Sequence, residues 1–164
     1  MLNAPAVVGY VDADWAGDAS DRKSTSGYVF MLYGGAISWR SRKQNMVSLS
    51  SCESEYVSLA EACKEMLWLK SLYGELGILS SGETFSLLID NAAAKFIAES
   101  EVVHDRSKHI DIRYHFIKDL VNSKAVILEH VGSSDNISDL LTKPLPTATL
   151  RSMVDMLGLA PSQQ

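Results

Sequence analysis

Hydrophobic residues along this chain follow two different periods, which separate predicted strands from predicted helices. Five short runs rich in apolar, β-branched and aromatic residues predict strands at 7–14, 27–32, 36–40, 84–90 and 125–131. Longer segments with apolar residues three and four positions apart predict helices at 51–76, 91–100, 109–123, 135–143 and 147–157. A turn at 33–35 is expected to join the second and third strands as a hairpin.

The helix expected at 51–76 carries the clearest boundary signals. Ser50 and Glu53 have the spacing of a capping box, and Gly77 follows the last apolar position as a typical terminator. Cys52 and Cys63 would lie on one face of this helix about three turns apart, which is too far for a disulfide. Two unpaired cysteines indicate a reducing compartment.

The order of the predicted elements indicates the class of fold. Three strands are followed by a helix, a strand, two helices, a strand and a helix, with one more helix near the C-terminus. This order is typical of an α/β protein with a mixed sheet, in which the later strands are reached through helical crossovers. We expect a single domain over 1–164, with a core at about 7–143 and a C-terminal extension at 144–164.

Composition and charge narrow the classes of function. The chain has 164 residues, of which 46% are apolar, so it can bury a substantial core. No apolar run reaches the ~18–20 residues that a membrane span needs, and we expect no membrane partner. The formal net charge of −5 argues against nucleic-acid binding by overall attraction. A polyanion would need a local basic patch, a bound cation or a neighbouring domain.

Four acidic residues fall at positions where side chains are usually buried. They are Asp12 in the first strand, Glu55 in the first turn of the long helix, Asp90 after the fourth strand and Asp139 after the last strand. Sites in open α/β sheets gather at the carboxyl ends of strands, and carboxylates that meet there need a cation such as Mg²⁺ or Mn²⁺. Each acid could equally be an ordinary cap or turn residue, and spacing alone leaves both interpretations open.

Four longer strings point to a known family. “YVDADWAGDASDRKSTSGYVF”, “ISWRSRKQNMVSLSSCESEYVSLAEACKEMLWL”, “KHIDIRYHFIKD” and “DNISDLLTKPLP” resemble the ribonuclease H domain of copia-type LTR retrotransposon polyproteins. The resemblance extends from about Val8 to Leu159. It implies a ribonuclease H-like fold, with a five-stranded mixed sheet flanked by helices and, here, an extra C-terminal helix.

The resemblance implies a role for each of the four acids. Asp12, five residues before Gly17, matches the first-strand aspartate of the family, and Glu55 in “SEY” matches its helix glutamate. Asp90 in “LLIDN” and Asp139 in “NISD” match the remaining two aspartates. As catalytic residues the four acids would hold two Mg²⁺ ions, for which Mn²⁺ can substitute. Asp12 would bridge the ions, with Glu55 and Asp90 near the leaving group and Asp139 on the nucleophile side.

The implied activity is Mg²⁺-dependent endonucleolytic cleavage of the RNA strand of RNA–DNA hybrids during reverse transcription of a retrotransposon. One ion would activate water and the other would stabilise the leaving 3′ oxygen. The alternative is a host-domesticated, non-catalytic ribonuclease H-like module that binds nucleic acid or acts as a scaffold. The intact set of four acids disfavours this alternative.

Two more residues lie close to the predicted acids. Asp14 shares a face of the first strand with Asp12, so the strand period allows both into a site. The resemblance singles out Asp12, and Asp14 becomes a supporting residue or a turn cap. His130 precedes Asp139 by nine residues, close to the spacing of a mobile histidine in related ribonucleases H. It could assist catalysis there, or it could be an ordinary histidine at a strand end.

Substrate contacts are expected where basic and hydroxyl residues are densest. The candidates are Arg22, Lys23, Arg42, Lys43, Ser50 and Ser51. Such groups commonly hold phosphates, and RNA would be recognised near Ser50 and Ser51 through 2′-hydroxyls. A solvated loop is an equally good interpretation for any one of them. Trp15, Trp39 and Trp68 are expected in the core.

The resemblance also implies partners and a location. The short segment between Asp90 and Lys108 leaves little room for a basic substrate handle. We therefore expect the reverse transcriptase domain of the same polyprotein to supply most of the grip on the hybrid. The isolated domain is expected to be a monomer, and the polyprotein is expected inside the cell, in a cytoplasmic virus-like particle.

Overall fold

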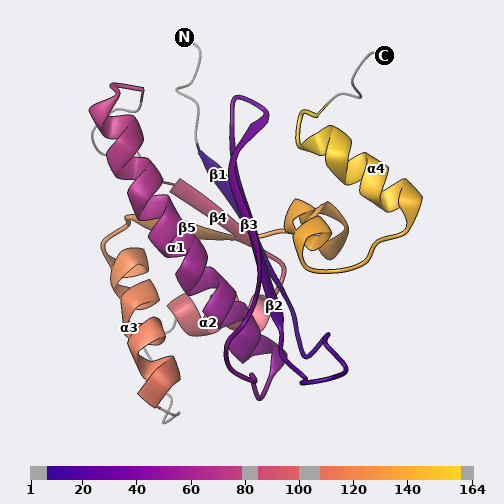
Figure 1. The fold of residues 1–164 in the computed structure, drawn as a ribbon. Coiled ribbons are helices and arrows are strands. Elements are labelled where there is room, and N and C mark those ends of the chain that lie inside the picture. Colours follow the sequence, from indigo (N-terminus) through magenta and orange to yellow (C-terminus); the bar gives the residue numbers. More distant parts are fainter. Residues whose placement is uncertain (1–6, 79–84, 100–107, 160–164) are drawn as a thin grey trace.

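A mixed five-stranded sheet separates two layers of helices in the computed structural model of the chain (Figure 1). The structure describes residues 7–78, 85–99 and 108–159, without the side chains of 108–111. The strands are β1 (Val8–Asp14), β2 (Thr25–Leu32), β3 (Gly35–Lys43), β4 (Phe85–Ile89) and β5 (Val126–His130). Their order in the sheet is β3-β2-β1-β4-β5.

The direction of pairing changes at β1, in the middle of the sheet. β1 pairs antiparallel with β2, and β2 pairs antiparallel with β3. On its other side β1 pairs parallel with β4, which pairs parallel with β5. The parallel strands are reached through helical connections, as their direction requires. The predicted α/β class with a mixed five-stranded sheet is therefore confirmed.

Helices cover both faces of the sheet (Figure 1). One face carries α1 (Ser51–Glu75), α2 (Ala92–Glu99) and α3 (Lys108–Asn122). The other face carries α4 (Thr147–Met156) and the 3-10 turn η2 (Ile137–Leu141), which follows the shorter turn η1 (Ser133–Asp135). Among the described helices, none combines the length and apolar character needed to cross a membrane.

Each helical layer has its own hydrophobic core. The larger core, between the sheet and α1 to α3, includes Phe30, Leu59, Met66, Leu87 and Ile117. The smaller core, between the sheet and α4, includes Val29, Met31, Ile137, Met153 and Leu157. β2 contributes alternate residues to both cores, because successive side chains of a strand point to opposite faces. The predicted C-terminal extension thus supplies a helix that covers one face of the sheet.

Most of the predicted helix boundaries agree with the structure. Ser50 Oγ accepts a hydrogen bond from the Glu53 backbone N–H at 3.1 Å and caps α1. The Glu53 carboxylate accepts from the backbone N–H of Leu49 at 2.7 Å, one residue before the partner that a capping box uses. Neither Cys52 nor Cys63 forms a disulfide within the part of the chain that the structure describes, and Cys63 is buried.

The helix predicted at 135–143 is wrong, since two short 3-10 turns occupy this part of the chain. Asn136 separates them with extended backbone angles, φ −81° and ψ 92°. Its side chain accepts a hydrogen bond from the Ser138 backbone N–H, a local contact that competes with helical bonding. The sequence pattern did not reveal this interruption.

The prediction that the three tryptophans lie in the core is also wrong. Trp15, Trp39 and Trp68 are 47%, 63% and 56% exposed. Trp15 follows the end of β1, and its indole N–H donates to the backbone oxygen of Ser48 at 3.0 Å. Trp39 lies on β3, which is an edge strand among the strands that the structure describes. Trp68 lies on α1 among exposed positions.

We predict that Gly27→Ala destabilises the fold. An added Cβ at Gly27 would lie 2.6 Å from Thr142 Cγ2 and 3.0 Å from Leu141 Cβ, where η2 crosses β2. The free energy of unfolding should fall by about 1–3 kcal/mol, as for other overpacking substitutions. Urea denaturation would measure this change. Gly74→Ala is the matched control, since nothing lies within 4 Å of its Cβ and alanine favours the helix. Equal effects of the two substitutions would contradict the prediction.

Candidate metal centre

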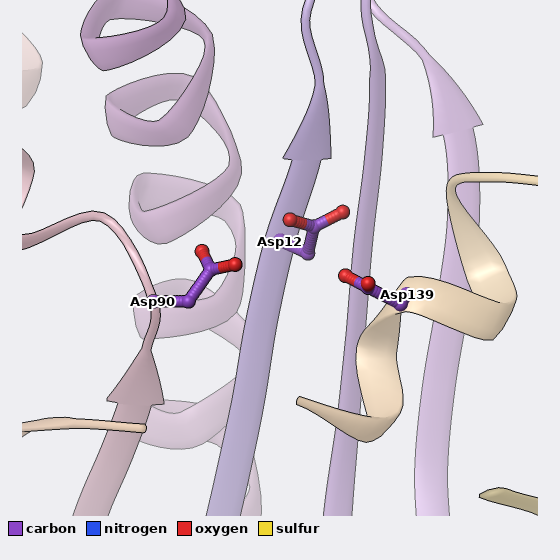
Figure 2. A group of neighbouring side chains, drawn as sticks. All are labelled: Asp12, Asp90 and Asp139. Atoms are coloured by element: carbon purple, nitrogen blue, oxygen red, sulfur yellow. The ribbon is translucent and has the colours of Figure 1, made fainter. Parts of the chain in front are cut away.

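Three carboxylates meet on one side of the sheet (Figure 2). Asp12 comes from β1, Asp90 follows β4 directly, and Asp139 lies in η2. One carboxylate oxygen from each residue lies within 4.8 Å of the other two. Asp12 is 1% exposed and Asp139 is 8% exposed. We call these three residues the carboxylate cluster; it contains three of the four acids predicted from the sequence.

Strand pairing explains why Asp12 and Asp90 are neighbours. β1 and β4 run parallel, with Val11 opposite Ile89, so the next residue of each strand lies side by side. Both acids therefore lie near the carboxyl ends of adjacent parallel strands, the usual place for a site in an α/β sheet. The two residues are far apart in the sequence, and this pairing alone brings them together.

Asn136 holds the third acid in position. Its side-chain Nδ2 donates to the backbone oxygen of Val11 at 3.0 Å, and its Oδ1 accepts from Ser138 Oγ at 2.6 Å. Asn136 is fully buried. It therefore connects the residue before Asp12 with the residue before Asp139. This asparagine in “NISD” was assigned no role from the sequence, although asparagine at the start of a helical turn is a known capping signal.

Glu55, the fourth predicted acid, approaches from α1 and lies outside the carboxylate cluster. Its Oε1 accepts a hydrogen bond from the Ala13 backbone N–H at 3.3 Å. Its Oε2 is buried and has no hydrogen-bond partner among the described residues. Burial raises the pKa of Glu55 to about 9, and the nearby charges of Asp12 and Asp90 add to this effect. A buried oxygen of this kind needs a proton or a cation.

Two residues that follow η2 complete the surroundings of the cluster. The Lys143 ammonium lies 3.2 Å from Asp12 Oδ1 and 2.9 Å from Asp139 Oδ1. The Thr142 hydroxyl donates to the other carboxylate oxygen of Asp12. Both residues belong to the string “DNISDLLTKPLP”, but sequence reasoning did not single them out. Lysine four positions after an aspartate was an available signal for the contact with Asp139.

Burial and the hydrogen bond between Asp139 and Lys143 shift the pKa values of these two residues in opposite directions. Burial raises the pKa of Asp139, whereas the hydrogen bond from Lys143 lowers it, and the net direction is upward. Burial alone would lower the pKa of Lys143. The hydrogen bond to Asp139 and the charge of Asp12 outweigh it, so the pKa of Lys143 is raised. Lys143 is therefore a cation held by two acids.

Asp14 and His130 lie beside the cluster without belonging to it. The Asp14 carboxylate lies against Gly17, where any Cβ would overlap it. Among the described residues, the Asp14 carboxylate does not join the three that lie within 4.8 Å of one another. His130 is exposed at the end of β5, with Nε2 3.2 Å from the backbone oxygen of Asp90. Its ring thus contacts the backbone of a cluster residue and not the carboxylate.

The residues present fit a divalent cation. The cluster offers carboxylate oxygens, the ligand type that Mg²⁺ and Mn²⁺ prefer. The unpartnered oxygen of Glu55 and the ammonium of Lys143 both indicate that positive charge is favourable here. The donor set contains no thiolate or imidazole, which softer metals prefer.

The predicted substrate residues occupy three separate segments. Arg22 and Lys23 lie in the turn between β1 and β2, where Arg22 has a φ of 57°. Ser50 caps α1, and Ser51 is its exposed first residue. Arg42 lies at the end of β3 and lines a surface cavity of about 190 Å³. Other lining residues include Arg40, Lys43, Gln44, Glu61 and Arg113.

Two of the predicted substrate lysines already have acidic partners. The Lys43 ammonium lies 2.5 Å from Asp18 Oδ2 and 2.8 Å from Asp21 Oδ2. Lys23 lies 4.0 Å from the same oxygen of Asp21. The hydrogen bonds to Asp18 and Asp21 raise the pKa of Lys43. Much of the positive charge of this segment is therefore balanced locally.

The shifted pKa of Glu55 predicts how stability depends on pH in the absence of metal. Its folded-state pKa of about 9 lies above the ordinary value of 4.5, so the folded chain binds the extra proton between these values. The stabilisation is complete below pH 4.5 and is lost as the pH rises through 9. In Glu55→Gln the free energy of unfolding should therefore decrease less steeply over this pH range, by about 1 kcal/mol per pH unit.

Urea denaturation in EDTA at several pH values would measure this effect. Glu75→Gln is the control, because Glu75 is exposed at the end of α1. Parallel curves for the parent and Glu55→Gln would show that Glu55 is already ionised in the folded chain, against the prediction.

Comparisons with known proteins bear on this geometry. No family model matches the chain. The retrovirus-related Pol polyprotein from transposon TNT 1-94 of Nicotiana tabacum is 38% identical over 155 residues, which are 94% of this chain and 12% of the polyprotein. The corresponding polyprotein from transposon RE1 of Arabidopsis thaliana is 41% identical over 157 residues, 96% of this chain and 11% of the polyprotein. The chain thus spans a small part of these relatives.

Solved structures share the fold at low sequence identity. The N-terminal ribonuclease H domain of Rv2228c from Mycobacterium tuberculosis matches with a TM-score of 0.60 and 14% identity, over 92% of this chain and 97% of that chain. LC11-RNase H1 in complex with an RNA/DNA hybrid matches with a TM-score of 0.57 and 14% identity, over 83% and 93% of the two chains. The chain is therefore a homologue of one segment of copia-type, retrovirus-related Pol polyproteins, and its fold is that of ribonuclease H.

Proposed function

We propose that this chain is a ribonuclease H domain that cleaves the RNA strand of RNA–DNA hybrids during reverse transcription of a copia-type element. The observation that carries the proposal is the carboxylate cluster. Two of its acids lie near the ends of parallel strands, the third lies in η2, and one oxygen of each is within 4.8 Å of the others. A ribonuclease H fold and homology to transposon Pol polyproteins support it. One neighbour of this fold is itself bound to an RNA/DNA hybrid.

Asp12, Asp90 and Asp139 would hold two Mg²⁺ ions, with Glu55 as the fourth ligand and Mn²⁺ able to substitute. Two such ions supply an activated water nucleophile and stabilise the leaving 3′ oxygen. The chain itself contributes fixed ligands. Asp12 is 1% exposed and is held by Thr142, and η2 is attached to β1 through Asn136. Fixed ligands matter because small displacements of a reacting group greatly reduce the rate.

Phosphates of the hybrid would bind along the end of β3. Arg42 is exposed and lines a surface cavity together with Arg40 and Arg113, and the Arg40 guanidinium pairs there with Glu61 at 3.4 Å. Guanidinium groups suit phosphate because they present several donors in a planar fork. Ser51, at the exposed start of α1, is a candidate donor for the sugar–phosphate backbone. We assign Arg22 and Lys23 a secondary role in the neighbouring turn.

The reverse transcriptase domain of the same polyprotein would supply most of the remaining grip. The chain has a net charge of −5, and Lys43 is balanced by Asp18 and Asp21. Binding of a polyanion by this segment alone therefore depends on a few arginines and on bound cations. The alternative is a non-catalytic module with the same fold. Measurements of hybrid cleavage distinguish the two possibilities.

We predict that Asp12→Asn and Asp90→Asn each lower hybrid cleavage by at least about a hundredfold, because each removes a charged ligand. A fluorescently labelled RNA–DNA hybrid with Mg²⁺ or Mn²⁺ would measure the cleavage rate. Asp119→Asn, on the exposed side of α3, is the matched control and should retain the parent rate. Equal rates for the parent and Asp12→Asn would refute the site. A parent that binds the hybrid without cleaving it would favour the non-catalytic module.

We also predict that Arg42→Ala weakens hybrid binding more than Lys43→Ala. Arg42 is exposed beside the cavity, whereas the Lys43 charge is already satisfied by two aspartates. Fluorescence anisotropy in an Asp12→Asn background would measure affinity without cleavage. The slope of log affinity against log salt concentration should decrease in magnitude by about one for Arg42→Ala and by less for Lys43→Ala. A larger loss for Lys43→Ala would contradict this assignment.

A further inference from the structure

Lys143 is the one described residue whose ammonium bridges two members of the carboxylate cluster. Its Nζ lies 3.2 Å from Asp12 Oδ1 and 2.9 Å from Asp139 Oδ1. The side chain of Asp12 is 1% exposed and that of Asp139 is 11% exposed, whereas that of Lys143 is 32% exposed. A partly solvated cation is thus paired with two largely buried anions.

The pairing has a clear electrostatic cause. Carboxylates within 4.8 Å of one another repel, and the repulsion is strong because buried charges are poorly screened. An ammonium held between two of them relieves this repulsion without any ligand from solution. Lysine suits the role because it carries a compact charge on a flexible four-carbon stem.

A divalent cation held by Asp12 Oδ1 and Asp139 Oδ1 would compete with the ammonium, because both need the negative charge of the same two oxygens and like charges repel. Lys143 has room to leave, since about a third of its side chain is already exposed. The Thr142 hydroxyl, which donates to the other oxygen of Asp12, can keep that carboxylate oriented during the exchange.

We propose that Lys143 is a tethered counter-ion of the carboxylate cluster, which neutralises Asp12 and Asp139 until a divalent cation displaces its ammonium. The inference rests on the proposed function, because it requires that the cluster binds such a cation. It assigns Lys143 two opposite effects. It stabilises the metal-free fold, and it weakens the binding of the metal by competing for the same oxygens.

Calorimetric titration of the whole chain with Mn²⁺ alone would test the second effect. Lys143→Met keeps the length of the stem and removes the charge, and it should bind Mn²⁺ at least about tenfold more tightly than the parent. Lys143→Arg retains the charge and should stay near the parent affinity. Lys64→Met is the control for the change in net charge, because Lys64 lies on α1 with a side chain 62% exposed.

Thermal unfolding would test the first effect with the same variants. In EDTA, Lys143→Met should have a lower Tm than the parent and Lys64→Met, and saturating Mn²⁺ should close this gap. Equal Mn²⁺ affinities of the parent and Lys143→Met would overturn the inference alone. Mn²⁺ binding by Lys143→Arg that is clearly tighter than in the parent would also overturn it. A Lys143→Met chain that remains unfolded in saturating Mn²⁺ would do the same. A parent that binds no Mn²⁺ would overturn the proposed function together with the inference.

Discussion

Repulsion among three neighbouring acids is the constraint on which the rest of this structure depends. Asp12, Asp90 and Asp139 bring their oxygens within 4.8 Å of one another, with Asp12 and Asp139 buried and Asp90 half-buried. Such an arrangement persists only if surrounding groups hold it and positive charge balances it. The parallel pairing of β1 with β4 and the amide of Asn136 supply the restraint. Lys143 supplies the charge within the chain.

The fold makes space for this arrangement at the point where η2 meets the sheet. Gly27 has no side chain, so Thr142 and Leu141 can come close to β2. α4 then covers the apolar residues that remain on this face, with Met153 and Leu157 in the smaller core. The elements after β5 therefore serve two purposes, since they complete the core and carry the third acid.

Local patterns in the sequence predicted the elements that depend on local interactions. The boundaries of α1 followed from the cap at Ser50, and the order of strands and helices followed from hydrophobic periodicity. The turns around Asn136 did not follow, because a hydrogen bond to Val11, distant in the sequence, competes with the helical pattern. The four acids stood out by their positions in the elements, and the family motifs gave them roles. The contact of Lys143 with Asp139, four positions away, was predictable, whereas its contact with Asp12 spans 131 positions and leaves no periodic trace.

The hydrogen bond between Asn136 and Val11 joins residues 125 positions apart, and this distance has a consequence for biosynthesis. A ribosome releases β1 well before η2, so the two partners of this hydrogen bond become available at different times. All five strands are available before Asp139 is in place. The strands that carry Asp12 and Asp90 therefore leave the ribosome before the third acid does. The carboxylate cluster is therefore complete only after η2 has been synthesised.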